Sequence, residues 1–303
     1  MPGNEAVFEV LSIGSGVTSL KKGDWVLPSQ TGLGCWRTHL QCEESEVYKI
    51  EKEDITIKAA ATVGVNGVTA FRLLTGFGYP NPFNDVTKQT RNLDDAEKGW
   101  YIQNGANSGV GRMVSQVGKA KGYRGIAIVR ARENKAEETA LKQEMLDLGA
   151  EKCVTDQEAG AKTFKEEVAE WTKDSGTPLQ LGLNCVGGDA ALNMAKVMAK
   201  HSTLVTYGAM ARAPMKIPAG MLIFNDLRFQ GFWVSEWAKQ QPREKQETVQ
   251  WLLHAYRSGK LLEQPSLDVK WDANTKKDEL FEAVQGTLDG YRKGKGIFVF
   301  ENT

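Results

Sequence analysis

Strand and helix patterns alternate regularly along the chain from Trp100 onward, and this alternation limits the fold more than any other feature. "WYIQNGANSGVG" predicts a strand that runs into a glycine loop, and "GRMVSQVGKAKG" predicts an amphipathic helix that stops at Gly122. The alternation continues through "GIAIVRA", a helix over 135–148, "KCVTD", a helix around 161–173, "LQLGLNCVGG", a helix over 189–199 and "STLVTYG". Such spacing predicts an α/β fold with a doubly wound parallel sheet.

Shorter β segments lie on both sides of this region. "EAVFEVL", "DWVLP", "GCWRTHLQC" and "EVYKI" predict strands before residue 58, and "AAATVGVNGVTAFRLLTG" predicts a helix that glycines interrupt near Val65. The C-terminal part predicts an aromatic-rich strand "DLRFQGFWVSEW", a helix from Pro242 to about Ser258, a strand "LDVKW", a helix over 276–289 and a last strand "GIFVF". With 303 residues the chain is long enough for two domains.

The charge balance and the cysteine spacing exclude several classes of function. Lys and Arg number 38, as do Asp and Glu, so no bulk charge favours nucleic acid or a membrane surface. No apolar run approaches the roughly 18 residues that span a bilayer, so we expect no membrane insertion. The N-terminal segment carries Glu5, Glu9 and Asp24 and shows no presequence pattern. A metal site or disulfide framework is not expected, because no C-x-x-C spacing joins the four cysteines, Cys35, Cys42, Cys153 and Cys185.

The loop from Gly105 to Gly111, "GANSGVG", lies between a predicted strand and a predicted helix. In that context a glycine-rich turn can hold a pyrophosphate, because small residues allow close backbone approach and the helix N-terminus offers N–H donors. The loop departs from G-x-G-x-x-G, since Asn107 stands at the second glycine position. A plain tight turn is the alternative. Two further glycine turns, "NCVGGDA" and "TYGAM", are expected at the same sheet edge.

The end of the next predicted strand indicates which cofactor is used. Sites for NAD usually place an acidic residue about 20 residues beyond the glycine loop, where it binds the ribose 2′-hydroxyl. Here the strand "GIAIVRAR" ends in Arg130 and Arg132, followed by Glu133. Guanidinium groups suit a 2′-phosphate, so the pattern favours NADPH. The alternative is that both arginines are simply solvated.

The order of these parts resembles the medium-chain dehydrogenase/reductase superfamily. In its zinc alcohol dehydrogenases a Gly-His-Glu triplet begins a strand that leads to a V-x-x-x-K-x-G-D-x-V turn. The segment "GNEAVFEVLSIGSGVTSLKKGDWV" has the same frame, with Asn4 where the zinc-ligand histidine would stand. The resemblance therefore implies a zinc-free member with no metal site.

Within that superfamily the chain is similar to the mitochondrial trans-2-enoyl-CoA or enoyl-acyl-carrier-protein reductases. The similarity extends from residue 3 to residue 300 and is carried by the motifs "GNEAVFEVLSIG", "GCWRTH", "AATVGVNGVTAFRLL", "WYIQNGANSGVGRMVSQVGK", "IVRAR", "TYGAM", "FQGFWVSEW" and "GKGIFVF". It implies a partial GroES-like, β-rich catalytic domain over 1–60 and a Rossmann NADPH-binding domain over 61–235. A C-terminal segment, 236–303, would return to the catalytic domain.

The resemblance also implies a set of NADPH contacts. They fall at a helix start, in the glycine loop, after the second Rossmann strand, in the turn beside the nicotinamide, on the aromatic strand and before the last strand. In this sequence those positions are Asn66; Asn107, Ser108, Gly109 and Val110; Arg130 and Arg132; Tyr207, Gly208, Ala209 and Met210; Phe232, Trp233 and Val234; and Lys295. For Phe232 and Trp233, core or dimer packing is the competing interpretation.

The implied activity is the NADPH-dependent reduction of a trans-2-enoyl thioester, carried by CoA or acyl carrier protein, to the saturated acyl thioester in fatty acid synthesis. A homodimer and a mitochondrial matrix location follow from the same resemblance. Two alternatives stay open, a zinc-free NADPH quinone reductase and a catalytically impaired NADPH-binding or dimerising relic.

Family members carry strands ahead of the "GNE" segment, including a substrate-cleft tyrosine in a stretch like N-Q-I-x-G-x-Y. This chain has no such stretch, so the resemblance leads us to expect a truncation before residue 3 and impaired catalysis. Whether Met1 is the true start stays open. We assign no catalytic residue, because Tyr48, Tyr79, Tyr101 and Tyr123 lack the matching context.

Overall fold

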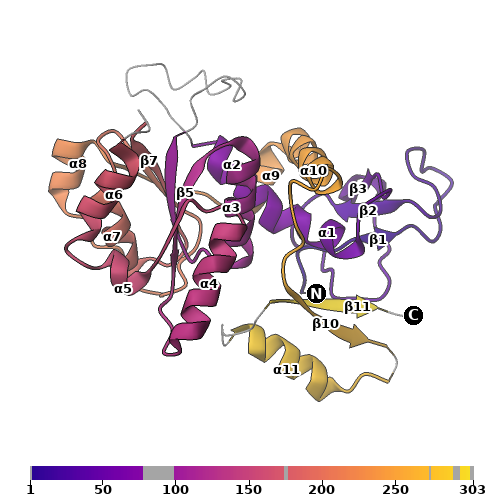
Figure 1. The fold of residues 1–303 in the computed structure, drawn as a ribbon. Helices are drawn as coiled ribbons and strands as arrows, with labels where there is room; N and C mark the ends of the chain where they lie inside the picture. The colour runs from indigo at the N-terminus through magenta and orange to yellow at the C-terminus, as the bar shows by residue number, and fades with distance from the viewer. Residues whose placement is uncertain (1, 78–98, 174–176, 273, 289–293, 301–303) are drawn as a thin grey trace. The chain divides into compact units, whose positions relative to one another are not determined.

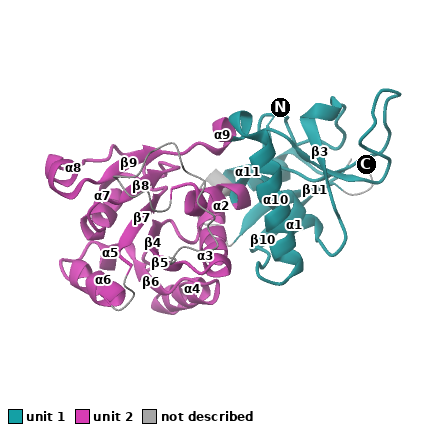
Figure 2. Ribbon diagram, turned by 90° about the horizontal axis from the view of Figure 1, so that it is seen from above, with its two compact units in different colours: residues 1–66, 238–303 teal, residues 67–237 magenta. Residues whose placement is uncertain are grey.

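The computed structural model describes residues 2–77, 99–173, 177–272, 274–288 and 294–300. These residues form two compact units, one made of residues 1–66 and 238–303 and the other of residues 67–237 (Figure 2). They are unit 1 and unit 2, respectively. The polar segment expected over 78–98 lies outside the described residues. The functional domains at 1–60, 61–235 and 236–303 stay a prediction.

Unit 2 is built on a six-stranded sheet whose strands are all parallel, in the order β6-β5-β4-β7-β8-β9. The strands are β4 (Trp100–Asn104), β5 (Arg124–Val129), β6 (Lys152–Thr155), β7 (Leu179–Asn184), β8 (Thr203–Thr206) and β9 (Arg228–Gly231). The order reverses between β4 and β7, which is the point where ligands bind in doubly wound sheets. The predicted fold class is confirmed.

Helices cover both faces of this sheet (Figure 1). On one face lie α2 (Val68–Thr75), α3 (Gly109–Lys121) and α4 (Lys135–Asp147). On the other lie α5 (Asp156–Ala159), α6 (Phe164–Thr172), α7 (Gly188–Val197) and α8 (Ala219–Asn225), and α9 (Val234–Gln240) follows β9. Successive side chains of a strand point to opposite faces. Accordingly, Ile126 and Ile128 of β5 belong to one core cluster, and Ala127 and Val129 to the other.

Helix α3 begins and ends where its sequence predicts. The Ser108 hydroxyl accepts a hydrogen bond from the Gly111 N–H at 3.1 Å, and Gly122 ends the helix with φ 77°. The buried Tyr101 ring fills the space beside two glycines: a Cβ would lie 2.8 Å from its hydroxyl at Gly118 and 2.3 Å at Gly125. The absence of side chains there lets α3 pack closely on β4 and β5.

Unit 1 contains two small sheets. β1 (Phe8–Glu9), β2 (Trp25–Pro28) and β3 (Val47–Ile50) are antiparallel, whereas β10 (Ser266–Trp271) and β11 (Lys295–Phe300) pair in parallel. Its helical segments are the short η1 (Glu44–Glu46), α1 (Ile57–Thr62), a π-helical turn η2 (Val63–Gly67), α10 (Pro242–Arg257) and α11 (Lys277–Leu288). The buried Lys245 of α10 donates hydrogen bonds to the carbonyl oxygens of Pro28 at 3.0 Å and Ser29 at 2.7 Å.

Two strand predictions are wrong. "GCWRTHLQC" forms no strand, because Gly34 has φ 78° and the Arg37 Nε bonds the Gly34 carbonyl at 2.7 Å, which bends the backbone locally. The aromatic-rich strand is also shorter than expected. It ends at Gly231, and helix α9 begins at Val234, so Phe232 and Trp233 lie in the connection between them.

Candidate functional site

The carboxyl edge of the six-stranded sheet gathers most of the residues that the sequence singles out. Four strands end there and lead directly into those segments: β4 into Asn107–Val110, β5 into Arg130 and Arg132, β8 into Tyr207–Met210, and β9 into Phe232–Val234. In a parallel sheet all these ends share one edge, and ligands bind there. The sheet therefore places thirteen of the fifteen predicted positions in one region of unit 2.

The glycine loop is held tightly against the strand ends. Gly105 has φ 59°, and a Cβ at this position would lie 2.5 Å from the Cys185 Sγ. A Cβ at Gly111 would lie 2.5 Å from the Ala106 carbonyl oxygen. The loop residues 107–110 are all partly exposed at the N-terminus of α3. A partly exposed loop at the start of a long helix fits an anionic group, which the N–H groups of the first turn can bind.

Arg112, in the first turn of α3, holds the loop from the side. Its guanidinium donates to the Asn107 carbonyl oxygen and forms a two-pronged ion pair with Glu144 of α4, at 2.9 and 3.0 Å. Its side chain is only 15% exposed. Because its donors serve the loop and Glu144, Arg112 has a structural role in the site.

Arg130 and Arg132 follow β5 directly and leave the sheet beside the glycine loop, whose Ala106 N–H bonds the Ile128 carbonyl of β5 at 3.1 Å. Arg130 is exposed and Arg132 is half-buried. Two guanidinium groups at this position can bind a phosphate with charge-assisted hydrogen bonds. The geometry therefore suits the expected 2′-phosphate contact, which stays a prediction.

A buried pair of asparagines joins the two central strands, and the sequence analysis missed it. Asn104 ends β4 and Asn184 ends β7, and they are 2% and 0% exposed. The Asn184 Oδ1 accepts from the Asn104 Nδ2 at 2.8 Å, the Val186 N–H at 3.2 Å and the Gly187 N–H at 3.0 Å. The Asn104 Oδ1 in turn accepts from the Cys185 N–H at 2.8 Å. These bonds fix the turn after β7 at the point where the strand order reverses. An asparagine at the end of each predicted central strand was the only sequence signal.

Replacing Asn184 by alanine should destabilise unit 2 by about 2 kcal/mol, because three N–H groups lose their shared acceptor and water replaces it only in part. Thermal unfolding measures the loss, and Asn193→Ala on the neighbouring helix α7 is the matched control. Equal melting temperatures for the two variants would show that the hydrogen bonds of Asn184 do not stabilise unit 2.

The turn after β8 is joined to the turn after β7 by backbone hydrogen bonds. The Tyr207 N–H bonds the Asn184 carbonyl, and the Met210 N–H bonds the Cys185 carbonyl, both at 2.9 Å. The Tyr207 hydroxyl is buried, and burial raises the pKa of Tyr207 well above its ordinary value. This hydroxyl is therefore neutral at physiological pH and is no general base.

Of the two aromatic residues after β9, Phe232 is packed against other rings and Trp233 is exposed. The Phe232 ring contacts those of Phe77 and Trp237, with centroid distances of 5.6 and 6.4 Å, whereas Trp233 is 67% exposed. These contacts favour the packing interpretation for Phe232. Cofactor contacts of Phe232, Trp233 and Val234 stay predictions.

Two predicted contacts belong to unit 1. Asn66 is half-buried in the π-helical turn, one residue before unit 2 begins. Lys295 begins β11, and its Nζ forms an ion pair with Glu5. Single π turns often occur at functional sites, so the position of Asn66 is consistent with a functional role. A cofactor role for either residue stays a prediction.

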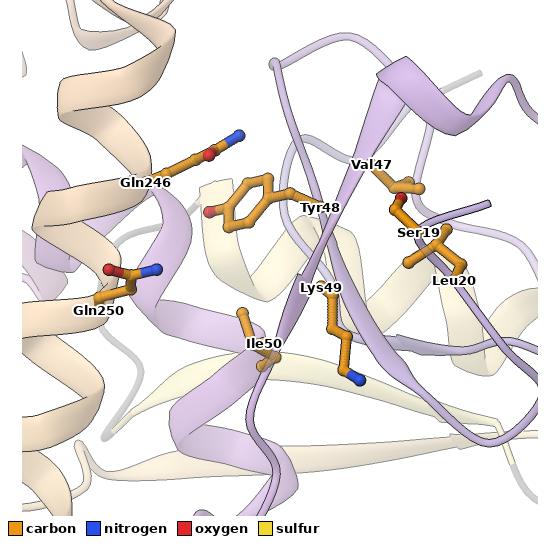
Figure 3. Close-up of a pocket in the computed structure, with 8 residues that line it drawn as sticks. All are labelled: Ser19, Leu20, Val47, Tyr48, Lys49, Ile50, Gln246 and Gln250. Atoms are coloured by element: carbon orange, nitrogen blue, oxygen red, sulfur yellow. The ribbon is translucent and has the colours of Figure 1, made fainter.

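Unit 1 also contains a cavity of about 340 Å³ between β3 and α10 (Figure 3). It is lined by Ser19, Leu20, Val47, Tyr48, Lys49, Ile50, Gln246 and Gln250, so it includes none of the predicted site residues. Among the described residues, no group of three or more His, Cys, Asp and Glu side chains could hold a metal ion. No helix of the described part is long and apolar enough to cross a membrane. We assign no catalytic residue.

Comparison with known proteins identifies the relatives of this chain. Residues 109–254 match the zinc-binding dehydrogenase family model. The chain is 36% identical to the mitochondrial enoyl-acyl-carrier-protein reductase of Yarrowia lipolytica, over 97% of this chain and 72% of that protein. It is 35% identical to an NADPH quinone oxidoreductase of Kluyveromyces marxianus, over 96% of this chain and 72% of that protein.

Solved structures agree with the sequence relatives. The Etr1p/NADP/crotonyl-CoA complex superposes with a TM-score of 0.84 at 32% identity, covering 98% of this chain and 79% of that one. The mitochondrial 2-enoyl thioester reductase Etr1p/Etr2p heterodimer of Candida tropicalis gives 0.83 at 33% identity, covering 95% and 78%. Sequence and structure together show that this chain belongs to the mitochondrial enoyl-acyl-carrier-protein reductases, the 2-enoyl thioester reductases of the medium-chain dehydrogenase/reductase superfamily.

Proposed function

We propose that this protein uses NADPH to reduce trans-2-enoyl thioesters to saturated acyl thioesters. The observation that carries the proposal is the carboxyl edge of unit 2, where a partly exposed glycine loop follows β4 and two arginines follow β5. A family relative in complex with NADP and crotonyl-CoA supports both the cofactor and the substrate class. The enoyl-acyl-carrier-protein reductase relatives support a carrier-protein substrate and a role in fatty acid synthesis.

Different residues of this sheet edge would bind different parts of the cofactor. The N–H groups of Ser108, Gly109 and Val110 would bind the pyrophosphate, and Arg130 with Arg132 would bind the 2′-phosphate. The turn from Tyr207 to Met210 would lie against the nicotinamide half. When bound, NADPH supplies the hydride for the thioester's β-carbon, and a proton must then reach the α-carbon.

A quinone reductase is the second candidate, and the relative from Kluyveromyces marxianus favours it. The two activities differ in their electron acceptor, so parallel assays with crotonyl-CoA and with a benzoquinone at fixed NADPH separate them. We expect turnover of the enoyl thioester to exceed that of the quinone. The reverse order would replace the proposed reaction with quinone reduction. NADPH binding without turnover of either acceptor would favour the relic.

We further propose a homodimer that forms through the β9 end of the sheet. Strand β9 ends the sheet order, and α8 before it exposes three apolar side chains, Leu222 at 49%, Ile223 at 70% and Phe224 at 73%. Exposed apolar groups beside an edge strand are typical of an association surface. The Etr1p/Etr2p heterodimer supports pairing within this family.

Replacing Phe224 by glutamate should convert the dimer to a 33.4 kDa monomer, because a charge would be buried in an apolar interface. Light scattering after size-exclusion chromatography measures the mass. Leu146→Glu is the control. Leu146 is 37% exposed on α4, at the end of the sheet opposite β9, so this variant should stay dimeric. A dimeric Phe224→Glu variant would place the interface elsewhere.

The relatives are named mitochondrial enzymes, and we propose a mitochondrial matrix location on that ground. Import of a fluorescent fusion into isolated mitochondria would test it.

A further inference from the structure

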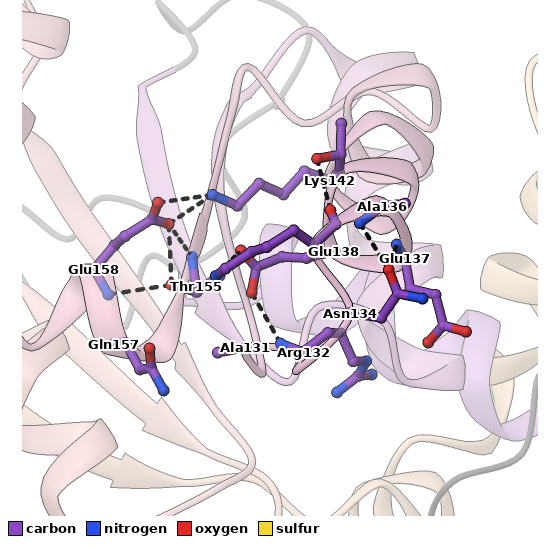
Figure 4. A network of polar contacts seen from close by, with 12 residues as sticks. Ala131, Arg132, Asn134, Ala136, Glu137, Glu138, Lys142, Thr155, Gln157 and Glu158 are labelled. Atoms are coloured by element: carbon purple, nitrogen blue, oxygen red, sulfur yellow. Dashed lines mark hydrogen bonds and ion pairs between the residues drawn. The ribbon is translucent and has the colours of Figure 1, made fainter.

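The short loop that carries Arg130 and Arg132 is held by two carboxylates from different elements. The Ala131 N–H donates to the Asp156 Oδ1 at 2.9 Å, and the Arg132 N–H donates to the Glu138 Oε2 at 2.9 Å. Asp156 begins α5. Glu138 lies in the first turn of α4, and Figure 4 shows its carboxylate directed at the Arg132 backbone. Two consecutive amides of the loop therefore have fixed partners.

Glu138 is unusually placed for a glutamate near a helix start. It is 7% exposed, and its second oxygen, Oε1, accepts from the Lys135 Nζ at 3.0 Å. The Arg132 N–H and the Lys135 ammonium together lower the pKa of Glu138, so the carboxylate stays ionised and able to accept hydrogen bonds at physiological pH. By contrast, the adjacent Glu137 is exposed.

We propose that Glu138 and Asp156 are positioning residues that select a 2′-phosphorylated cofactor by fixing the loop between Arg130 and Arg132. This inference rests on the proposed function. With the Ala131 and Arg132 amides already bonded, the loop cannot offer them to a phosphate, and the guanidinium groups must supply the recognition. A loop fixed before binding spares the ligand the cost of ordering it.

Because Glu138 and Asp156 are charged, the direction in which their removal changes the ligand affinity tests the proposal. A carboxylate near a phosphate site repels the ligand, so a role through charge alone predicts tighter binding when Glu138 is removed. A positioning role predicts weaker binding, because the loop becomes free to move. Glutamine at position 138 removes the charge but keeps an oxygen that can accept from the Arg132 N–H.

The experiment compares the binding of adenosine 2′,5′-bisphosphate and adenosine 5′-monophosphate by isothermal titration calorimetry. Glu138→Ala should raise the Kd of the bisphosphate about tenfold, the scale of one lost ordering hydrogen bond. It should leave the Kd of the monophosphate unchanged. Glu138→Gln should stay close to the wild-type protein, and so should Glu137→Ala, which removes the same charge one residue away. Asp156→Ala, at an exposed position, should act in the same direction as Glu138→Ala and serves if that variant fails to fold.

In turnover assays Glu138→Ala should raise the KM for NADPH, whereas kcat and the KM for NADH should not change. Bisphosphate binding that is equal or tighter in both Glu138→Ala and Asp156→Ala would overturn the proposal. A wild-type protein that binds the bisphosphate no better than the monophosphate would instead contradict the NADPH assignment itself. The two failures are thus distinct, because the first appears only in the variants.

Discussion

Replacing Arg130 and Arg132 together by alanine should raise the KM for NADPH by about 100-fold or more while changing the KM for NADH little. Both side chains follow β5 at the sheet edge and are at least partly exposed. A charge-assisted hydrogen bond contributes roughly 1.5–3 kcal/mol, and 1.4 kcal/mol is a factor of ten in affinity. Because NADH lacks the 2′-phosphate, its binding does not use these groups. Steady-state kinetics with the two cofactors in parallel measures the change.

Arg124 provides a control for the loss of a positive charge on the same strand. It begins the same strand at the opposite end, where it pairs with Glu151 at 3.1 Å. Arg124→Ala removes the same charge but should leave the ratio of NADPH to NADH efficiency as it is. An unchanged ratio in the Arg130 and Arg132 double variant would mean that another group binds the 2′-phosphate or that none does.

Replacing Gly105 by alanine should destabilise unit 2 by about 3 kcal/mol and weaken the binding of both cofactors. The position has φ 59°, which costs an L-residue roughly 1–2 kcal/mol. The added Cβ would also lie 2.5 Å from the Cys185 Sγ, and crowding of this kind in a packed interior costs roughly 1–3 kcal/mol. Cys185 is 4% exposed and its neighbours are close, so the sulfur has little room to move. Thermal unfolding and cofactor titration measure the two effects.

The Cys185→Ala change separates the two causes. In the double variant the sulfur is gone, so the crowding is relieved while the backbone strain at residue 105 persists. We therefore expect Gly105→Ala to cost about half as much stability in the Cys185→Ala background as it costs in the wild-type protein. No recovery would assign the whole cost to backbone strain, and a Gly105→Ala protein as stable as the wild type would contradict the described loop.

The doubly wound sheet was predictable because its signals are local. The apolar runs of β4, β5 and β7 and the amphipathic pattern of α3 identify their elements without tertiary information. The strand expected at "GCWRTHLQC" failed for the opposite reason. Its cysteines, Trp36 and Leu40 are apolar, but Gly34 has a positive φ and the Cys35 N–H bonds the Gly3 carbonyl at 3.0 Å, a contact distant in sequence.

The site was predictable where it depends on chain order and hidden where it depends on packing. The glycine loop and Arg130 lie immediately after strands, so a strand pattern is enough to find them. Asn184 could not be found in this way, because its partners Asn104 of β4 and Thr206 of β8 reach it only after the sheet forms. Glu138 was hidden for the same reason, since nothing in the pattern of α4 distinguishes it from Glu137.

The most direct test of the account is NADPH oxidation by the purified 303-residue chain with crotonyl-CoA, with NADH run in parallel and the product identified by mass spectrometry. We predict butyryl-CoA formation that depends on NADPH and proceeds far more efficiently with NADPH than with NADH. Equal use of both cofactors, or NADPH oxidation without butyryl-CoA, would contradict the proposed function.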